Sequence, residues 1–189
     1  MTDGPKPQLH VYLRVETLQT SFIAPQGSFL MAAGVAIAER SDDRPHHVFT
    51  MFGLAPTQDW MRMGGLAEAI RLYDQPETDI LISSSGMPQL ATIVGQDGIK
   101  NAKKQERYVG HEWVKDLKSA ITSSPRRWRQ VQPVPAYKQN AEGVALRAAR
   151  VGIEAAKRHH LLPHPISPFR ESGAKSGSLS WRALNTGRR

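Results

Sequence analysis

The hydrophobic and polar positions of the chain change period along its length, and these changes predict a mixed α/β domain. Residues 9–17, 28–39 and 46–54 are rich in β-branched, aromatic and small apolar side chains, and a polar turn at 40–44 separates the last two. This pattern predicts three successive strands in an antiparallel meander. Residues 78–83 form a short, almost continuous apolar run, which is typical of a parallel strand covered on both faces.

Helical periods alternate with these strands. Residues 59–73 are predicted to form a helix, because apolar side chains recur on one face, opposite Arg62, Glu68 and Arg71. The members of that apolar face are Met63, Leu66, Ala67, Ile70 and Tyr73. This helix is expected to lie on the sheet with its charged residues toward solvent.

The second half of the chain predicts a short helix at 87–94, a helix that carries Trp113 and ends before Pro125, and a polar edge strand at 127–134. An alanine-rich helix is predicted over 140–158, and its apolar stripe is expected to be Val144, Ala148, Val151 and Ala155. The expected order is βββαβααβα, with a five-stranded mixed sheet flanked by helices.

The composition predicts a single domain with two extensions. At 189 residues and 21.0 kDa the chain can bury one ordinary core. Residues 1–8 are expected to form an N-terminal arm and residues 9–158 the domain. Residues 159–189 are dense in Pro, Ser and Gly and are expected to form a flexible basic tail.

The sequence also excludes several classes of protein. It contains no cysteine, which excludes disulfides, thiolate zinc sites and cysteine nucleophiles. No stretch approaches 18 uncharged apolar residues, and the N-terminus lacks the pattern of a signal peptide. We therefore expect a cytoplasmic protein without membrane contact.

The charge is distributed unequally between the two halves. Residues 1–98 carry six Lys and Arg against eleven Asp and Glu, a net charge of −5, whereas residues 99–189 have a net charge of +13. Such asymmetry is typical of a surface that binds a polyanion.

Three short motifs lie in this basic half. Trp113 leads the segment 113–117, residues 127–131 read Arg-Trp-Arg-Gln-Val, and residues 140–146 read Asn-Ala-Glu-Gly-Val-Ala-Leu. Together with the order of strands and helices, these motifs resemble ribonuclease H. In that family a strand with the motif Trp-x-x-Val precedes a final helix with the motif Asn-x-x-x-Asp-x-Leu. The match runs from Trp128 to Leu146 without a gap. The resemblance implies a ribonuclease H-like fold over residues 9–158.

A ribonuclease H binds two divalent cations between four carboxylates, one to activate the attacking water and one to stabilise the leaving oxygen. The resemblance places Val144 at the Asp of the final helix, Ser84 at the Asp of the fourth strand and Gly64 at the Glu of the first helix. The mobile histidine of the family falls on Val134.

On the first strand, Arg14, Val15 and Glu16 are candidates for the remaining position, and only Glu16 could bind a metal. We therefore predict no catalytic residue, no metal site and no cofactor.

Acids elsewhere in the chain leave an alternative open, in which relocated carboxylates rebuild a metal site. The candidates are Glu16, Glu68, Asp79 and Glu142. Each requires a different backbone placement, and the four are expected to be surface residues.

The basic residues between 99 and 139 are the candidates for contact with nucleic acid. They are Lys100, Lys103, Lys104, Arg107, Arg126, Arg127, Arg129 and Lys138. The first four lie where the bacterial enzyme that the chain resembles has a basic protrusion that handles its substrate. Phosphate contacts position a duplex and carry little sequence information, so a partner bound with little sequence preference is expected.

These observations predict a catalytically inactive ribonuclease H-like protein that binds DNA, RNA or a hybrid, or a nucleic-acid-processing complex, through its basic second half. Two alternatives remain open. One is a protein-interaction or inhibitory accessory module of a mobile element, and the other is a metal-dependent nuclease with relocated carboxylates.

Overall fold

A computed structural model describes residues 7–18, 29–38, 45–73, 75, 77–84, 111–131 and 140–160. Their strands are β1 (Gln8–Thr17), β2 (Phe29–Ala38), β3 (His47–Ala55), β4 (Asp79–Ser83) and β5 (Trp128–Val131). The helices are α1 (Gln58–Tyr73), α4 (His111–Ser123) and α5 (Ala141–His160), with a 3-10 turn, η1, at Pro125–Arg127. Each of the strands and α-helices was predicted from the sequence, and most bounds agree within two residues, whereas η1 was not predicted.

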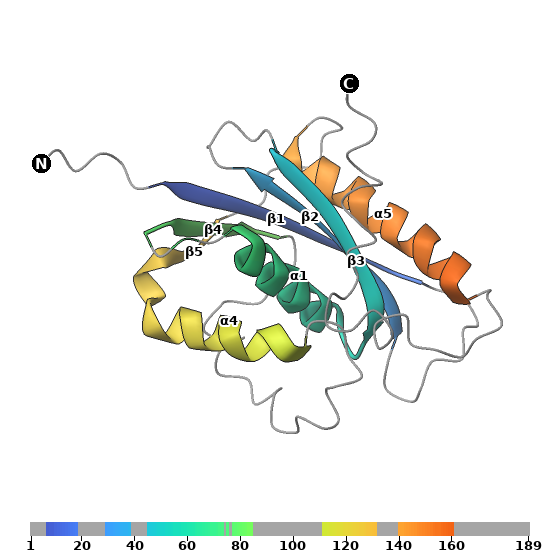
Figure 1. The fold of residues 1–189 in the computed structure, drawn as a ribbon. Helices are drawn as coiled ribbons and strands as arrows, with labels where there is room; N and C mark the ends of the chain where they lie inside the picture. Colours follow the sequence, from blue (N-terminus) through green and yellow to red (C-terminus); the bar gives the residue numbers. More distant parts are fainter. Residues whose placement is uncertain are drawn as a thin grey trace, which may run out of the picture.

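The five strands form one mixed sheet in the order β3-β2-β1-β4-β5 (Figure 1). β1, β2 and β3 are antiparallel neighbours, which confirms the predicted meander. β4 is parallel to both β1 and β5, and β5 lies at the edge of the sheet as its prolines and polar residues predicted. The fold is therefore a mixed α/β sheet with flanking helices.

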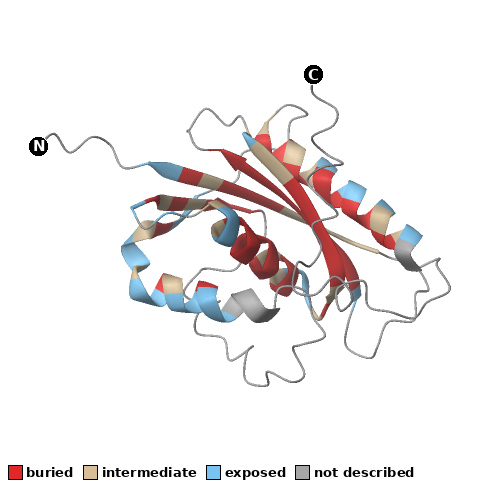
Figure 2. Ribbon diagram, in the orientation of Figure 1, coloured by how far each residue is buried: buried red, intermediate tan, exposed pale blue. Residues whose placement is uncertain are grey.

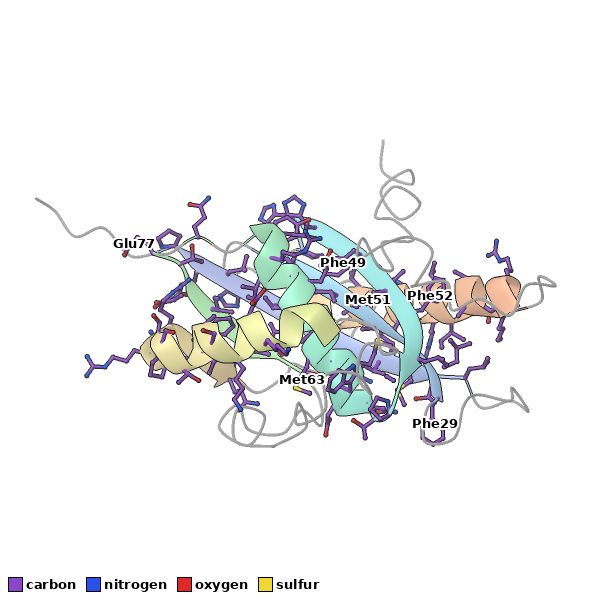
Figure 3. All side chains as sticks on the ribbon, turned by 60° about the horizontal axis from the view of Figure 1, so that its bottom comes forward. Phe29, Phe49, Met51, Phe52, Met63 and Glu77 are labelled. Atoms are coloured by element: carbon purple, nitrogen blue, oxygen red, sulfur yellow. The ribbon has the colours of Figure 1, made fainter. Side chains whose placement is uncertain are left out.

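The helices cover the two faces of the sheet unequally, as Figure 1 shows. α1 and α4 lie on one face, and α5 packs on the other face against β1, β2 and β3. Side chains of each strand alternate between these two layers. On β3, Phe49 and Met51 join the core beneath α1, whereas Phe52 packs in the cluster beneath α5 (Figure 3).

α1 is buried on more of its circumference than its sequence predicted. Residues 63–69 are all buried, and Figure 2 shows the helix enclosed between the sheet and α4. A Cβ at Gly65 would contact Leu13, Val35 and Ala33 on the sheet side. The expectation that Glu68 faces solvent is wrong, because its side chain is only 6% exposed and lies in the buried stretch of α1.

The predicted apolar stripe of α5 is wrong in part. Val151 is 43% exposed, and the buried positions include Ala145, Ala149, Gly152 and Ala156. The reason is that the backbones of β2 and α5 approach each other closely. A Cβ at Gly34 of β2 would overlap the carbonyl oxygen of Ala145 and the amide of Ala149, and a Cβ at Gly152 would overlap the Thr50 hydroxyl. Small residues therefore define the packed face, and the larger Val151 lies outside it.

Several predictions fall outside the described residues. These are the helix at 87–94, strand residues 132–134, residues 1–6 of the arm and residues 161–189 of the tail. α5 includes His159 and His160, the first two residues of the predicted tail. Within the described part of the chain, no helix is long and apolar enough to cross a membrane.

Candidate functional site

The candidate site is built on β1, whose side chains alternate between the two layers. Leu13 and Val15 point to the core beneath α1, whereas Tyr12 and Arg14 face α5. Tyr12 is buried and stacks near His10, with ring centroids 6.4 Å apart. Of the three first-strand candidates, Arg14 is therefore the one that projects toward the beginning of α5.

Arg14 forms a long-range ion pair with Glu142 in the first turn of α5. The Nη1 atom of Arg14 donates a hydrogen bond to Oε1 of Glu142 over 3.2 Å. The Glu142 side chain is 1% exposed and that of Arg14 is 28% exposed. Because the carboxylate is buried, the guanidinium supplies the opposite charge that makes its burial tolerable.

Three other predicted positions surround the segment 12–14. Gly64 of α1 precedes Gly65, which packs directly on Leu13. Ser84 follows Ser83, the residue of β4 that pairs with Tyr12. Both serine side chains are buried, and neither hydroxyl has a hydrogen-bond partner among the described residues.

Val144, the last of these predicted positions, lies on α5, across the sheet from α1. It packs against the cluster that contains Tyr12, Ala36 and Ala145. The structure thus brings an ion pair, a buried hydroxyl, a glycine and an apolar side chain around one segment of β1.

Glu16 does not belong to this arrangement. It lies two residues beyond Arg14 on β1, and its Oε1 atom is 3.5 Å from Nε of Arg150. Arg150 is eight residues beyond Glu142, or about 12 Å farther along the axis of α5. The first-strand acid that could bind a metal is therefore held by a different part of the helix.

Each of the four acids that could have relocated is paired with a different arginine. The pairs are Arg14–Glu142, Arg71–Glu68, Arg129–Asp79 and Arg150–Glu16. Both carboxylate oxygens of Glu68 accept hydrogen bonds from the guanidinium of Arg71, at 2.8 and 2.7 Å. The expectation that all four are surface residues is wrong for Glu68 and Glu142, which are 5% and 1% exposed.

The described residues include no group of three or more His, Cys, Asp or Glu side chains that could hold a metal ion.

Three of the eight predicted nucleic-acid contacts lie in described segments. Arg126 is exposed in η1. Arg127 donates from Nε to the Thr78 carbonyl at 2.9 Å and from Nη2 to the Gln75 carbonyl at 2.8 Å, so it anchors the segment before β4. Arg129 is 59% exposed and pairs with Asp79 at 3.1 Å. The other five, Lys100, Lys103, Lys104, Arg107 and Lys138, lie outside the described residues.

Sequence reasoning missed the ion pair at the centre of this site. Arg14 and Glu142 were each considered as possible ligand positions, but they are 128 residues apart in sequence and no local pattern connects them. The available signal was a charged residue between the apolar residues Leu13 and Val15 of β1.

No protein-family model and no curated protein sequence matches this chain. Similar solved structures are found, however. The ribonuclease H domain of prototype foamy virus is 10% identical and superimposes with a TM-score of 0.53, covering 80% of this chain and 97% of the viral domain.

Two other ribonucleases H match at lower TM-scores. LC9-RNase H1 has 16% identity, a TM-score of 0.41 and coverage of 79% of this chain and 75% of that chain. The enzyme from Halobacterium salinarum has 11% identity, a TM-score of 0.40 and coverage of 76% and 98%. The strand order, the placement of the helices and the superposition on the viral domain together show that this chain has a ribonuclease H-like fold.

Proposed function

We propose that this protein is a catalytically inactive ribonuclease H-like protein that binds nucleic acid through its basic second half. The observation that carries the proposal is the Arg14–Glu142 ion pair. It lies on the β1 segment near Gly64, Ser84 and Val144, the positions to which the resemblance assigns the other metal-binding carboxylates.

Two-metal cleavage requires several carboxylates to neutralise the charge of both cations. Gly64, Ser84 and Val144 supply none at the positions that the resemblance assigns. The permanently charged Arg14 guanidinium would repel a divalent cation brought to this segment. The residues present therefore do not fit a pair of metal ions, and no step of a cleavage reaction is assigned to them.

The arginine pairing also argues against a nuclease with relocated carboxylates. A metal ion would have to compete with a guanidinium at each of the four acids, and at Glu68 with a two-oxygen contact. Loss of any pair would in turn leave an arginine without its acid. Their pairing favours a structural role for these acids.

The nucleic-acid part of the proposal rests on the fold and on the charge of the sequence. Residues 99–139 contain ten Lys and Arg against three acids. Of the predicted contacts, Arg126 and Arg129 are exposed on η1 and β5. Such residues contact phosphates, which implies binding with little preference for base sequence.

A cleavage assay on an RNA/DNA hybrid with Mg²⁺ or Mn²⁺ tests the proposal. The wild-type protein is expected to bind the hybrid and leave the RNA intact. Glu16→Gln and Glu142→Gln variants discriminate the rival nuclease. Metal-dependent cleavage that either substitution abolishes, in a variant that still folds, would overturn the proposal.

A further inference from the structure

α5 presents arginines to solvent along the side that faces away from the sheet. Arg147, Arg150 and Arg158 are all exposed, and Arg150 is 66% exposed. Figure 2 shows exposed residues along the outer edge of this helix, on the face of the sheet opposite to α1 and α4. We refer to these three residues as the α5 arginine stripe.

The helix geometry aligns the three arginines. At 100° per residue, Arg150 and Arg158 lie about 60° and 20° from Arg147 around the helix, on either side of it. From Arg147 to Arg158 the stripe extends about 16 Å along the axis. Along that length one strand of a nucleic-acid duplex presents about five phosphates.

The acids near the stripe neutralise it only in part. Glu154 lies on the same side of α5 as the three arginines, and its carboxylate pairs with Lys157 at 2.6 Å. Glu16 of β1 pairs with Arg150 at 3.5 Å. Counting both acids and Lys157, these residues of the described segments have a net charge of about +2, which complements a polyanion.

We propose that the α5 arginine stripe binds the phosphodiester backbone of a nucleic-acid duplex. This inference rests on the proposed function, and it places a second contact region on the opposite face of the sheet from α4. Arginine suits this role because its planar fork of N–H donors matches the oxygens of a phosphate.

The stripe is separate from the predicted contacts at residues 99–139. α5 packs on β1, β2 and β3, whereas Arg126 and Arg129 lie at the β5 edge of the sheet. Val151, which is 43% exposed, lies about 40° from Arg147 around the helix and borders the stripe. The α5 contact is therefore testable without altering the other basic residues.

The test compares two double variants that remove the same charge. Arg147→Gln/Arg158→Gln alters the stripe and leaves the Arg150–Glu16 pair intact. Lys115→Gln/Lys118→Gln is the matched control, since both lysines are exposed on α4 across the sheet and neither is among the eight predicted nucleic-acid contacts. Binding of a fluorescent DNA duplex, and of an RNA/DNA hybrid of the same sequence, is measured by anisotropy over a series of salt concentrations.

The stripe variant is expected to weaken binding about tenfold at low salt, which corresponds to about 1.4 kcal/mol for the two lost phosphate contacts together. The slope of log K against log salt should become shallower by about 2, because two counterion-releasing contacts are lost. The control should change affinity and slope much less, and both variants should keep the wild-type melting temperature.

Two results would overturn the inference and leave the proposed function standing. They are wild-type affinity in the stripe variant, or equal weakening by both variants, which would indicate a general effect of net charge. Failure of the wild-type protein to bind any duplex at low salt would overturn the proposed function and the inference together.

Discussion

Removing Arg14 should destabilise the protein because it takes the guanidinium away from a buried carboxylate. Breaking a buried ion pair on one side costs about 3–5 kcal/mol. The Arg14 side chain is 28% exposed, so water can partly solvate the remaining charge, and we expect about 2–3 kcal/mol for Arg14→Met. The reverse change, Glu142→Gln, should cost about 1 kcal/mol, because the guanidinium can turn toward solvent.

The double variant Arg14→Met/Glu142→Gln removes both charges and should be more stable than Arg14→Met alone. The expected coupling free energy between the two sites is about 2 kcal/mol. Arg150→Met is the matched control. Its partner Glu16 is 34% exposed and Arg150 is 66% exposed, so its loss should cost less than about 0.5 kcal/mol.

The assay is urea unfolding followed by circular dichroism, with the denaturant slope compared among all variants. A cost for Arg14→Met as small as that for Arg150→Met would refute the reasoning. So would additive effects of the two changes at Arg14 and Glu142, because additivity would mean that the side chains do not interact.

Four further predictions concern packing, anchoring and binding. Gly34→Ala should destabilise the protein by about 2 kcal/mol or more in thermal unfolding, because its methyl group would overlap the carbonyl of Ala145 on α5. Arg127→Gln should lower the free energy of unfolding by about 1–3 kcal/mol, because it removes hydrogen bonds to two backbone carbonyls. Arg126→Gln should leave unfolding within about 0.5 kcal/mol and weaken duplex binding. Removing three charges from the basic segment should make the salt slope of duplex binding shallower by about 2–3, through the variant Lys103→Ala/Lys104→Ala/Arg107→Ala.

The elements were predictable from sequence because their signals are local. The almost continuous apolar run before Ser84 indicated a strand covered on both faces, and the β-branched and aromatic residues of 9–17 indicated another strand. The order of elements then restricts the topology. The edge position of β5 followed from the missing N–H groups of its flanking prolines. These features require no knowledge of distant contacts.

The features that the sequence missed depend on contacts between distant segments. Helical periodicity put Val151 inside and Glu68 outside, whereas in the structure Val151 is exposed and Glu68 is buried. For α5, the close approach of its backbone to Gly34 selects the small residues as the packed face. The Arg14–Glu142 pair joins the first strand to the last helix, and no spacing in the sequence encodes it. Which side chains are buried at the candidate site therefore depends on how the sheet and the helices pack together, and the local sequence does not determine it.

The most direct test of the central claim is the affinity for an RNA/DNA hybrid with and without divalent cations. Binding is measured at fixed ionic strength in EDTA and in Mg²⁺, and the RNA is then recovered from the same samples. If Arg14 and its neighbours have replaced a metal site, the dissociation constants should agree within about twofold and the RNA should be intact. Binding at least tenfold tighter in Mg²⁺, together with cleaved RNA, would contradict the account.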